Sequence, residues 1–228
     1  MYKFYSENSL SNQTYIDLNP QESWHASKVL RLKAKDSCII LNGRGEKATG
    51  IITEISPKAC KVELTEINKA GQGKILNLLV APPKSTHRWE FILEKAQEFN
   101  VNRIQPVLCK NSERKKINLE KAKNQIRAAL KQCGAYYETE VLDFIKFNEA
   151  LKQYSPGFFG YCNELNQGHY FTALGNQTNL FIGPEGDLSE VEAENLFNQG
   201  WKNVILGKNI LRTESAALAG MVLFENNL

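Results

Sequence analysis

The sequence has few of the residues that build disulfide frameworks and metal clusters. Its five cysteines lie 22 or more residues apart without a Cys-x-x-Cys pair, and it has only three histidines. This scatter argues against a disulfide-stapled domain and against a zinc site. We therefore expect no bound metal, and free cysteine thiols that are mostly buried in the core.

Long apolar runs are also missing. The longest apolar runs, such as residues 75–81, which Asn77 interrupts, are far shorter than the roughly 20 residues that cross a bilayer. The first residues, Met1-Tyr-Lys-Phe-Tyr-Ser-Glu7, lack the apolar core of a secretion signal. We therefore expect a cytoplasmic protein without a membrane partner.

Two common nucleotide-binding signatures are absent. No Gly-x-Gly-x-x-Gly follows an apolar run, and no glycine-rich loop ends in the Lys-Ser/Thr pair that grips phosphate and magnesium. These absences disfavour a dinucleotide-dependent enzyme and an enzyme that acts on nucleotide phosphates.

The charge of the chain is unevenly distributed. The formal net charge is only +3, but residues 84–131 hold 12 Lys and Arg against 5 Asp and Glu, whereas residues 132–228 hold 5 against 12. A basic block of this size indicates a polyanionic partner, and the alternative is a solvated, lysine-rich helix face.

The N-terminal third reads as a small β-rich domain. Apolar residues alternate or cluster at residues 38–41, 49–55 and 60–67, with a glycine-bearing hairpin connection at 42–46. Residues 22–31 have helical spacing. We expect a small β-barrel over residues 1–70, closed by a glycine-containing linker at 68–74.

From residue 74 to residue 228 the pattern changes to alternating strands and helices. Strands are predicted at 75–81, 103–108 and 157–162, and helices at 85–100 and 118–132, the second one closed by Gly134. Such alternation indicates an α/β domain with a mainly parallel sheet covered on both faces.

Two apolar runs that end in glycine and continue into a helix start are the most informative features. The first is Leu180-Phe-Ile-Gly-Pro-Glu-Gly-Asp-Leu-Ser-Glu-Val-Glu192, and the second is Val204-Ile-Leu-Gly-Lys-Asn-Ile-Leu-Arg-Thr-Glu-Ser215. We expect neighbouring strands whose carboxyl ends share one crevice, where open α/β sheets bind ligands. Glu185 and Asp187 make the first turn acidic, which suits a neutral or cationic ligand such as an adenosine that carries a sulfonium.

Helix-start signals follow both turns. Ser189 and Glu192 form a capping box, and Thr213 is expected to be the N-cap of a helix over residues 214–225. This last helix is apolar almost throughout, so it must be buried in the core or at a subunit interface. Arg212 should then lie at the mouth of the crevice.

The two turns together resemble the RsmE family of bacterial methyltransferases in the SPOUT superfamily. The resemblance rests on Ile182-Gly-Pro-Glu-Gly186, on Leu188-Ser-x-x-Glu192, and on Leu206-Gly-x-x-Ile-Leu-Arg-Thr-Glu214 followed by Ala216. It extends to His25-x-x-x-Val-Leu-Arg-Leu-Lys-x-x-Asp36, which resembles the start of a PUA-like RNA-binding domain, and to residues 84–106.

This resemblance implies a SPOUT-type sheet with a C-terminal trefoil knot, preceded by a PUA-like β-barrel domain. It implies a homodimer that uses S-adenosylmethionine to methylate N3 of a uridine in 16S rRNA of the small ribosomal subunit. The cofactor-binding residues carried over are Leu180, Ile182, Gly183, Pro184, Glu185, Gly186, Leu206, Gly207, Leu211, Thr213 and Ala216. Asp187 departs from the family pattern, which has a second glycine there.

We assign catalytic roles to Arg212 and Glu214. The proton on uridine N3 must leave, and a fixed guanidinium at Arg212 would stabilise the negative charge that results. Glu214 could orient Arg212 or help to remove the proton. The RNA is expected to contact basic residues of both domains, namely Lys28, Arg31, Lys33, Lys110, Arg114, Lys115, Lys116 and Arg127.

Two other functions remain open at this stage. A knotted ribose 2′-O methyltransferase would share the cofactor-binding architecture but differ in the second turn. A non-catalytic RNA-binding protein could retain the same fold, in which case it would not bind S-adenosylmethionine.

Overall fold

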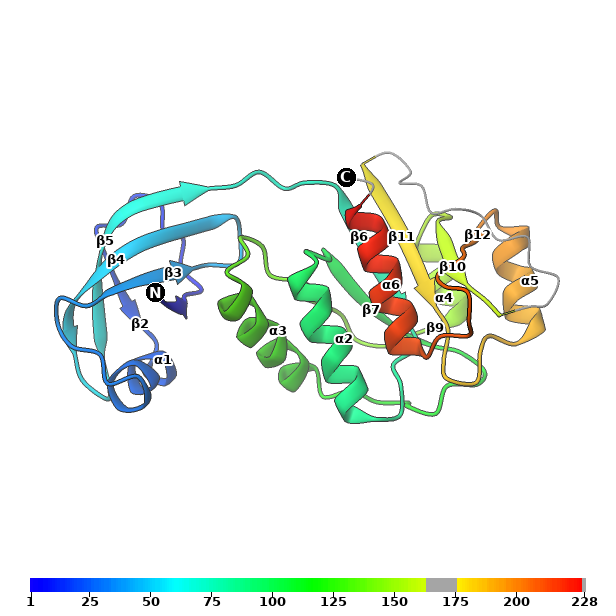
Figure 1. Cartoon of the computed structure of the whole chain (residues 1–228), viewed down its shortest axis with the longest axis horizontal. Helices are drawn as coiled ribbons and strands as arrows, with labels where there is room; N and C mark the ends of the chain where they lie inside the picture. The colour runs from blue at the N-terminus through cyan, green and yellow to red at the C-terminus, as the bar shows by residue number, and fades with distance from the viewer. Residues whose placement is uncertain (163–175, 227–228) are drawn as a thin grey trace. The chain divides into compact units, whose positions relative to one another are not determined.

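The computed structural model describes residues 1–162 and 176–226 (Figure 1). Contacts between residues divide the chain into two units, the N-terminal unit (1–72 with 127–138) and the C-terminal unit (73–126 with 139–228). This division differs from the expected ranges 1–70 and 74–228 mainly at 127–138, the end of one helix and the loop after it, which pack with the first unit.

The N-terminal unit is built on a five-stranded sheet. Its strands are β1 (Tyr2–Tyr5), β2 (Tyr15–Leu18), β3 (Ser37–Leu41), β4 (Glu46–Ile55) and β5 (Cys60–Lys69), in the order β1-β3-β4-β5-β2. The β1–β3 pair is parallel and the other pairs are antiparallel. Register shifts between β4 and β5 bend the sheet around its core, and β1 and β2 remain as its edges.

The expected strands of this unit correspond to β3, β4 and β5, and the hairpin after β3 turns through Gly43 and Gly45, both with positive φ. The four-residue strands β1 and β2 were missed, because so short a run carries little periodicity. The five cysteines are free thiols, as expected, but Cys133 and Cys162 are exposed rather than buried.

The helix expected at 22–31 was wrong at both ends. Helix α1 (Pro20–Trp24) begins earlier, because the Asn19 side chain accepts a hydrogen bond from the Glu22 amide (2.8 Å) and caps it. A π-helical turn, η1 (His25–Val29), continues from α1, and Arg31 then adopts φ 54° and ends the helical segment.

The C-terminal unit contains a sheet in which every pair is parallel among the residues that the structure describes. Its strands are β6 (Ile75–Val80), β7 (Arg103–Leu108), β8 (Glu140–Val141), β9 (Ile145–Lys146), β10 (Phe158–Gly160), β11 (Gln177–Ile182) and β12 (Lys202–Asn203). The order is β12-β10-β11-β6-β7-β8, and β9 also pairs with β7. This is the predicted α/β domain with a mainly parallel sheet.

Helices cover both faces of this sheet. One face carries α2 (Thr86–Glu98), the first part of α3 (Leu119–Cys133) and α6 (Thr213–Glu225), and the other carries α4 (Phe147–Gln153) and α5 (Glu190–Asn198) (Figure 1). The strands supply alternate residues to the two cores, so that Leu78 of β6 joins one and Leu79 the other.

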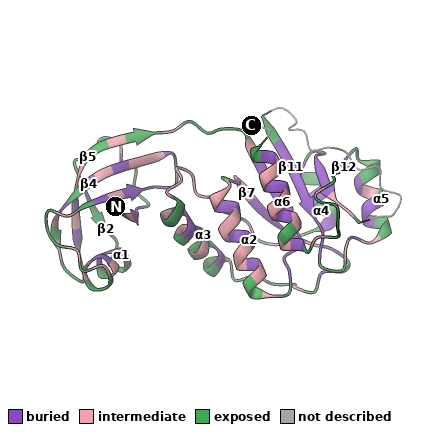
Figure 2. Cartoon of the chain, in the orientation of Figure 1, coloured by how far each residue is buried: buried purple, intermediate pink, exposed green. Residues whose placement is uncertain are grey.

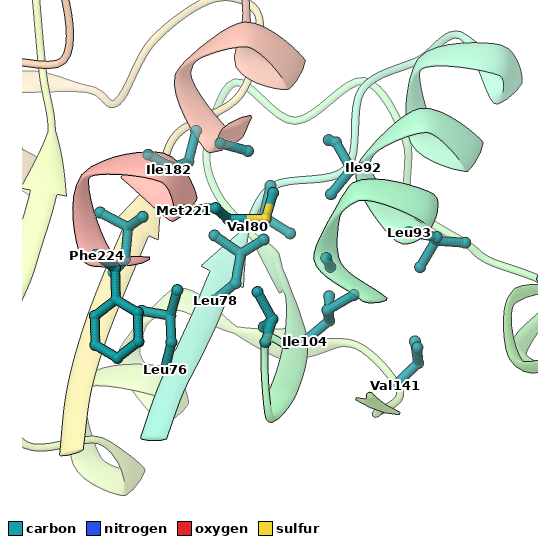
Figure 3. Close-up of a cluster of buried hydrophobic side chains, with 14 of the residues drawn as sticks. Leu76, Leu78, Val80, Ile92, Leu93, Ile104, Val141, Ile182, Met221 and Phe224 are labelled. Atoms are coloured by element: carbon teal, nitrogen blue, oxygen red, sulfur yellow. The ribbon is translucent and has the colours of Figure 1, made fainter. Parts of the chain in front are cut away.

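The core beneath α2 and α6 fixes where their first turns lie. In Figure 3, Leu78 and Val80 of β6 lie next to Met221 of α6, Leu76 lies next to Phe224 of α6, and Ile92 of α2 belongs to the same core. Residues along β6 and β11 are buried almost without interruption (Figure 2). Because α2 follows β6 directly, its N-terminus starts at the carboxyl edge of the sheet.

Gly157, just before β10, offers a test of how closely the central strands pack. A Cβ added there would lie 2.1 Å from the main-chain oxygen of Asn179, and neither backbone can give way without disturbing the sheet. We expect Gly157→Ala to lower the free energy of unfolding by about 1–3 kcal/mol, measured by urea denaturation.

The control for this substitution is Gly73→Ala. A Cβ at Gly73 would have no neighbour within 4 Å, so this variant should unfold like the unmodified chain. Equal stability of the two variants would contradict the packing observed at Gly157.

Candidate functional site

The first motif turn follows β11 and is held in a defined shape. Gly183 and Pro184 are buried, whereas Glu185 and Gly186 are exposed. The Asp187 amide donates to the Pro184 carbonyl (2.9 Å), which closes the turn, and Asp187 has φ 59°. Here aspartate therefore occupies a left-handed position that favours glycine.

The Asp187 side chain stabilises the first turn, although the Asp187 backbone adopts an unfavourable left-handed conformation there. It accepts hydrogen bonds from the amides of Leu188 (2.8 Å) and Cys162 (3.1 Å). Burial nevertheless raises the pKa of Asp187, and these two amides only partly offset that effect. Asp187 therefore acts within the turn rather than pointing freely at a ligand.

A segment after β7 braces the same turn. The Asn111 side-chain amide donates to the carbonyls of Gly186 (3.1 Å) and Asp187 (3.0 Å). The Lys110 amide donates to Glu192 Oε1 (2.8 Å), while Glu192 also completes the predicted capping box with Ser189. The capping box is confirmed, and its glutamate has a second, tertiary partner.

The second motif turn follows β12, which ends at Asn203, one residue before the apolar run 204–206 begins. The prediction that β11 and β12 are neighbours was wrong, because β10 lies between them. All three strands run in the same direction, so both turns still leave the same edge of the sheet.

Thr213 joins the two turns. Its buried hydroxyl donates to the carbonyl of Gly183 (3.2 Å), which belongs to the first turn. The expected N-cap role of Thr213 was therefore wrong. Arg212 is the N-cap residue, in an extended conformation and without a side-chain capping hydrogen bond, and Thr213 is the first residue of α6.

Arg88 of α2 makes a second connection between the turns. Its Nη1 lies 2.6 Å from Glu185 Oε1 in the first turn, and its Nε lies 3.3 Å from Glu214 Oε1 at the start of α6. Glu185 Oε2 also accepts from the Lys84 amide (2.9 Å). One guanidinium therefore holds the carboxylates of both motif turns.

Arg88 was not among the residues predicted for the site, although the sequence carries a signal for it. Helix 85–100 was predicted from its apolar stripe alone, and its polar N-terminal residues were treated as part of the basic block. A helix that follows a strand of a parallel sheet begins at the sheet edge where ligands bind. This rule alone points to the first turn of helix 85–100, which contains Arg88.

A cavity of about 940 Å³ opens beside these connections, within the size range of small-molecule sites. Four of the predicted residues line it, namely Leu206, Gly207, Leu211 and Glu214. The remaining lining residues are His87, Arg88, Phe91, Ile205, Lys208, Ser215, Leu218, Ala219, Val222 and Leu223. The wall is mainly apolar, with charged groups from α2 and from the second turn.

The other predicted cofactor residues do not line this cavity. Leu180 and Ile182 are buried in the core beneath α6, Gly183 and Pro184 are buried in the first turn, and Ala216 is half-buried on α6. Gly186 is exposed at the tip of the first turn, next to Asn111. They support the shape of the two turns more than they offer surface to a ligand.

The two predicted catalytic residues differ in their surroundings. The Glu214 carboxylate is 14% exposed, and its Oε2 is buried without a hydrogen-bond partner among the described residues. Arg212 is exposed, and its guanidinium forms no ion pair within residues 1–162 and 176–226. A buried acceptor and an unpaired cation therefore lie two residues apart.

The predicted RNA-binding residues fall into two groups. Lys28, Arg31, Lys33, Lys110, Lys115 and Lys116 are exposed. Arg114 instead donates to the carbonyls of Pro83 and Lys84 (both 2.7 Å), and Arg127 is paired with Glu138 and Glu7 (both 3.1 Å). Two guanidinium groups of the basic block thus stabilise the fold itself.

Neither a metal nor a membrane is indicated by the part of the chain that the structure describes. It contains no group of three or more His, Cys, Asp or Glu residues that could hold a metal ion. None of its helices is long and apolar enough to cross a membrane.

Comparisons with known protein families match the two parts of the chain. The model of the RNA methyltransferase domain matches residues 73–225, and the model of the RNA methyltransferase PUA domain matches residues 18–65. The ribosomal RNA small subunit methyltransferase E of Rickettsia conorii is 25% identical over 96% of this chain and 93% of its own length. The protein of the same name from Bacillus subtilis is 25% identical over 89% and 86%.

Solved structures agree over the whole length. A probable rRNA methyltransferase from Porphyromonas gingivalis has a TM-score of 0.89 at 25% identity, covering 100% of this chain and 98% of that one. The ribosomal RNA small subunit methyltransferase E of Neisseria gonorrhoeae, solved with S-adenosyl methionine, has a TM-score of 0.87 at 25% identity, covering 99% and 97%. This chain belongs to the RNA methyltransferase family, with the family's catalytic domain following its PUA domain.

Proposed function

We propose that this chain transfers a methyl group from S-adenosylmethionine to N3 of a uridine in 16S rRNA of the small ribosomal subunit. The observation that carries the proposal is the pair of motif turns, tied together by Thr213 and Arg88 beside a cavity of about 940 Å³. The similarity to ribosomal RNA small subunit methyltransferase E over 96% of this chain supports the choice of substrate.

The residues at the cavity suit S-adenosylmethionine. Leu206 and Leu211 offer apolar surface for an adenine ring, and the backbone beside Gly207 is open to close approach. The Glu214 carboxylate adds negative charge to this wall, which suits a cationic ligand. When bound, the cofactor supplies a methyl group on a positively charged sulfur.

The chain's own residues would position the uridine and accept the proton from its N3 atom. Arg88 fixes one oxygen of Glu214, so that the other oxygen keeps a defined direction and can accept the N3 proton. Among the residues that the structure describes, Arg212 has no ion pair to break before it binds the negatively charged uridine oxygens. Since methyl transfer depends on in-line geometry, this ordering contributes directly to the rate.

We further propose the homodimer and the trefoil knot that the family resemblance implies. Leu218, Val222 and Leu223 of α6 are only half-buried and form an apolar wall of the cavity, which suits coverage by a second copy. Sedimentation equilibrium should give the mass of two chains, and a monomer at catalytic concentrations would refute the dimer.

Mapping the methyl group tests the reaction itself. Small subunits from cells that lack this protein are incubated with the chain and labelled S-adenosylmethionine, and the rRNA is digested and analysed by mass spectrometry. We expect one modified uridine with the methyl on the base. A ribose methyl would favour a 2′-O methyltransferase, and absence of cofactor binding would favour a non-catalytic RNA-binding protein.

Arg212→Ala tests the catalytic assignment. The Arg212 side chain makes no capping hydrogen bond, so its loss should leave α6 intact. We expect the turnover rate to fall about 100-fold or more, because the charge that develops on uridine loses its stabilising cation. The affinity for S-adenosylmethionine, measured by titration calorimetry, should be unchanged.

Lys202→Ala is the matched control, since Lys202 is an exposed cation on β12 outside the cavity. It should retain full turnover, and Arg212→Lys should retain part of it. Unchanged turnover in Arg212→Ala would remove Arg212 from the mechanism.

A further inference from the structure

Trp24, the last residue of α1, is far more exposed than the other two tryptophans. Its relative exposure is 54%, against 4% for Trp89 and 2% for Trp201. Tryptophan is normally buried over most of its surface. The neighbouring residues Ser23 and Ala26 are fully buried, so the helix packs on its other side and Trp24 faces outward.

Four cations follow Trp24 within a short stretch. Lys28, Arg31, Lys33 and Lys35 are all exposed, and none of them forms an ion pair with a carboxylate in the described ranges 1–162 and 176–226. Lys28 lies four residues after Trp24, so the two side chains share a face of the helical segment. Residues 24–35 therefore combine an exposed aromatic ring with four positive charges that no carboxylate of the described residues neutralises.

The backbone presents this stretch in an unusual but well-held conformation. The Leu30 amide donates to the His25 carbonyl (3.0 Å), which is the long hydrogen bond of a π-turn, a feature that is often found at functional sites. Arg31 and Lys35 both have positive φ, which is uncommon for residues other than glycine.

Hydrogen bonds fix the stretch to the sheet of the N-terminal unit. The Lys35 amide donates to the Ile52 carbonyl (2.8 Å), and the Ile52 amide donates to the Asp36 carbonyl (3.0 Å). The Asp36 side chain accepts from the Lys33 amide (2.7 Å). The cations are thus displayed on a preformed loop, and binding a ligand would require little ordering.

We propose that Trp24 stacks on one unpaired base of the RNA substrate, while Lys28 and Arg31 hold the phosphates on either side. Single-stranded RNA is recognised in this way, by aromatic rings that stack on bases and by cations that follow the backbone. The choice of RNA as the occupant rests on the proposed function and on the charge of the loop.

Three other aromatic residues of this unit are less available for stacking than Trp24. Phe4 and Tyr5 are buried and serve the core, and Tyr15 is already covered by the Lys61 ammonium, 5.2 Å from its ring centre. Trp24 has no such partner among the described residues, which leaves both its ring and its surrounding charge available.

The test compares the affinity of full-length Trp24→Ala and Trp24→Phe variants for 16S rRNA by filter binding. We expect Trp24→Ala to weaken binding by about 5- to 150-fold, with Trp24→Phe restoring most of it, because a stacked aromatic is replaced by another. The KM for RNA should rise with kcat and cofactor affinity unchanged. Tyr15→Ala, which removes a similarly exposed ring, is the control and should bind normally.

The salt dependence of affinity separates stacking from phosphate binding. The slope of log affinity against log salt should be unchanged in Trp24→Ala and should fall by about one in Lys28→Ala. RNA should also quench the tryptophan fluorescence of the unmodified chain, and Trp24→Phe, which keeps only Trp89 and Trp201, should lose this quenching.

Absence of quenching, or a Trp24→Ala variant with unmodified RNA affinity, would overturn the stacking role. A fall in the salt slope of Trp24→Ala would overturn it as well, since the loss would then be electrostatic. Failure of the unmodified chain to bind 16S rRNA either free or within the small subunit would instead refute the proposed function.

Discussion

The candidate site depends on one guanidinium placed between two carboxylates. Arg88 comes from α2, Glu185 from the turn after β11, and Glu214 from the start of α6. These side chains are 14–32% exposed, so each pair contributes little stability, about 1 kcal/mol or less. Their importance is geometric, since without Arg88 the two carboxylates would lose the cation that they share and the turns would lose their common support.

The parallel sheet makes this arrangement possible. Because β10, β11 and β12 run in the same direction, the chain leaves each motif strand at one edge, and α2 begins at that edge after β6. The hydroxyl of Thr213 then bonds directly to the Gly183 carbonyl. A buried polar bond of this kind is costly to leave unmade, so it fixes the spacing of the two turns as well as joining them.

Local patterns were predicted well, and long-range geometry was not. Strand 103–108 and the Ser189–Glu192 capping box depend on neighbours in the sequence, and both were recovered. The order β12-β10-β11 and the partners of Thr213 and Arg88 depend on pairing between residues 22 to 126 positions apart, as Phe158–Leu180 and Arg88–Glu214 illustrate. The type of a residue predicts which interactions its side chain can form. Only the fold determines which other residue lies close enough to form them.

The charged residues also show that sequence does not determine partners, and this changes which cations are expected to bind RNA. The basic block at 84–131 seemed the natural contact for RNA, yet Arg114 donates to main-chain carbonyls and Arg127 stacks 4.7 Å above the Tyr5 ring between two glutamates. A cation already paired must exchange one partner for another when it meets a phosphate, and the net gain is small. Lys28, Arg31, Lys33 and Lys35, like Lys110, Lys115 and Lys116 of the block, have no carboxylate to give up in the part of the chain that is described, so these cations keep their full charge for a phosphate.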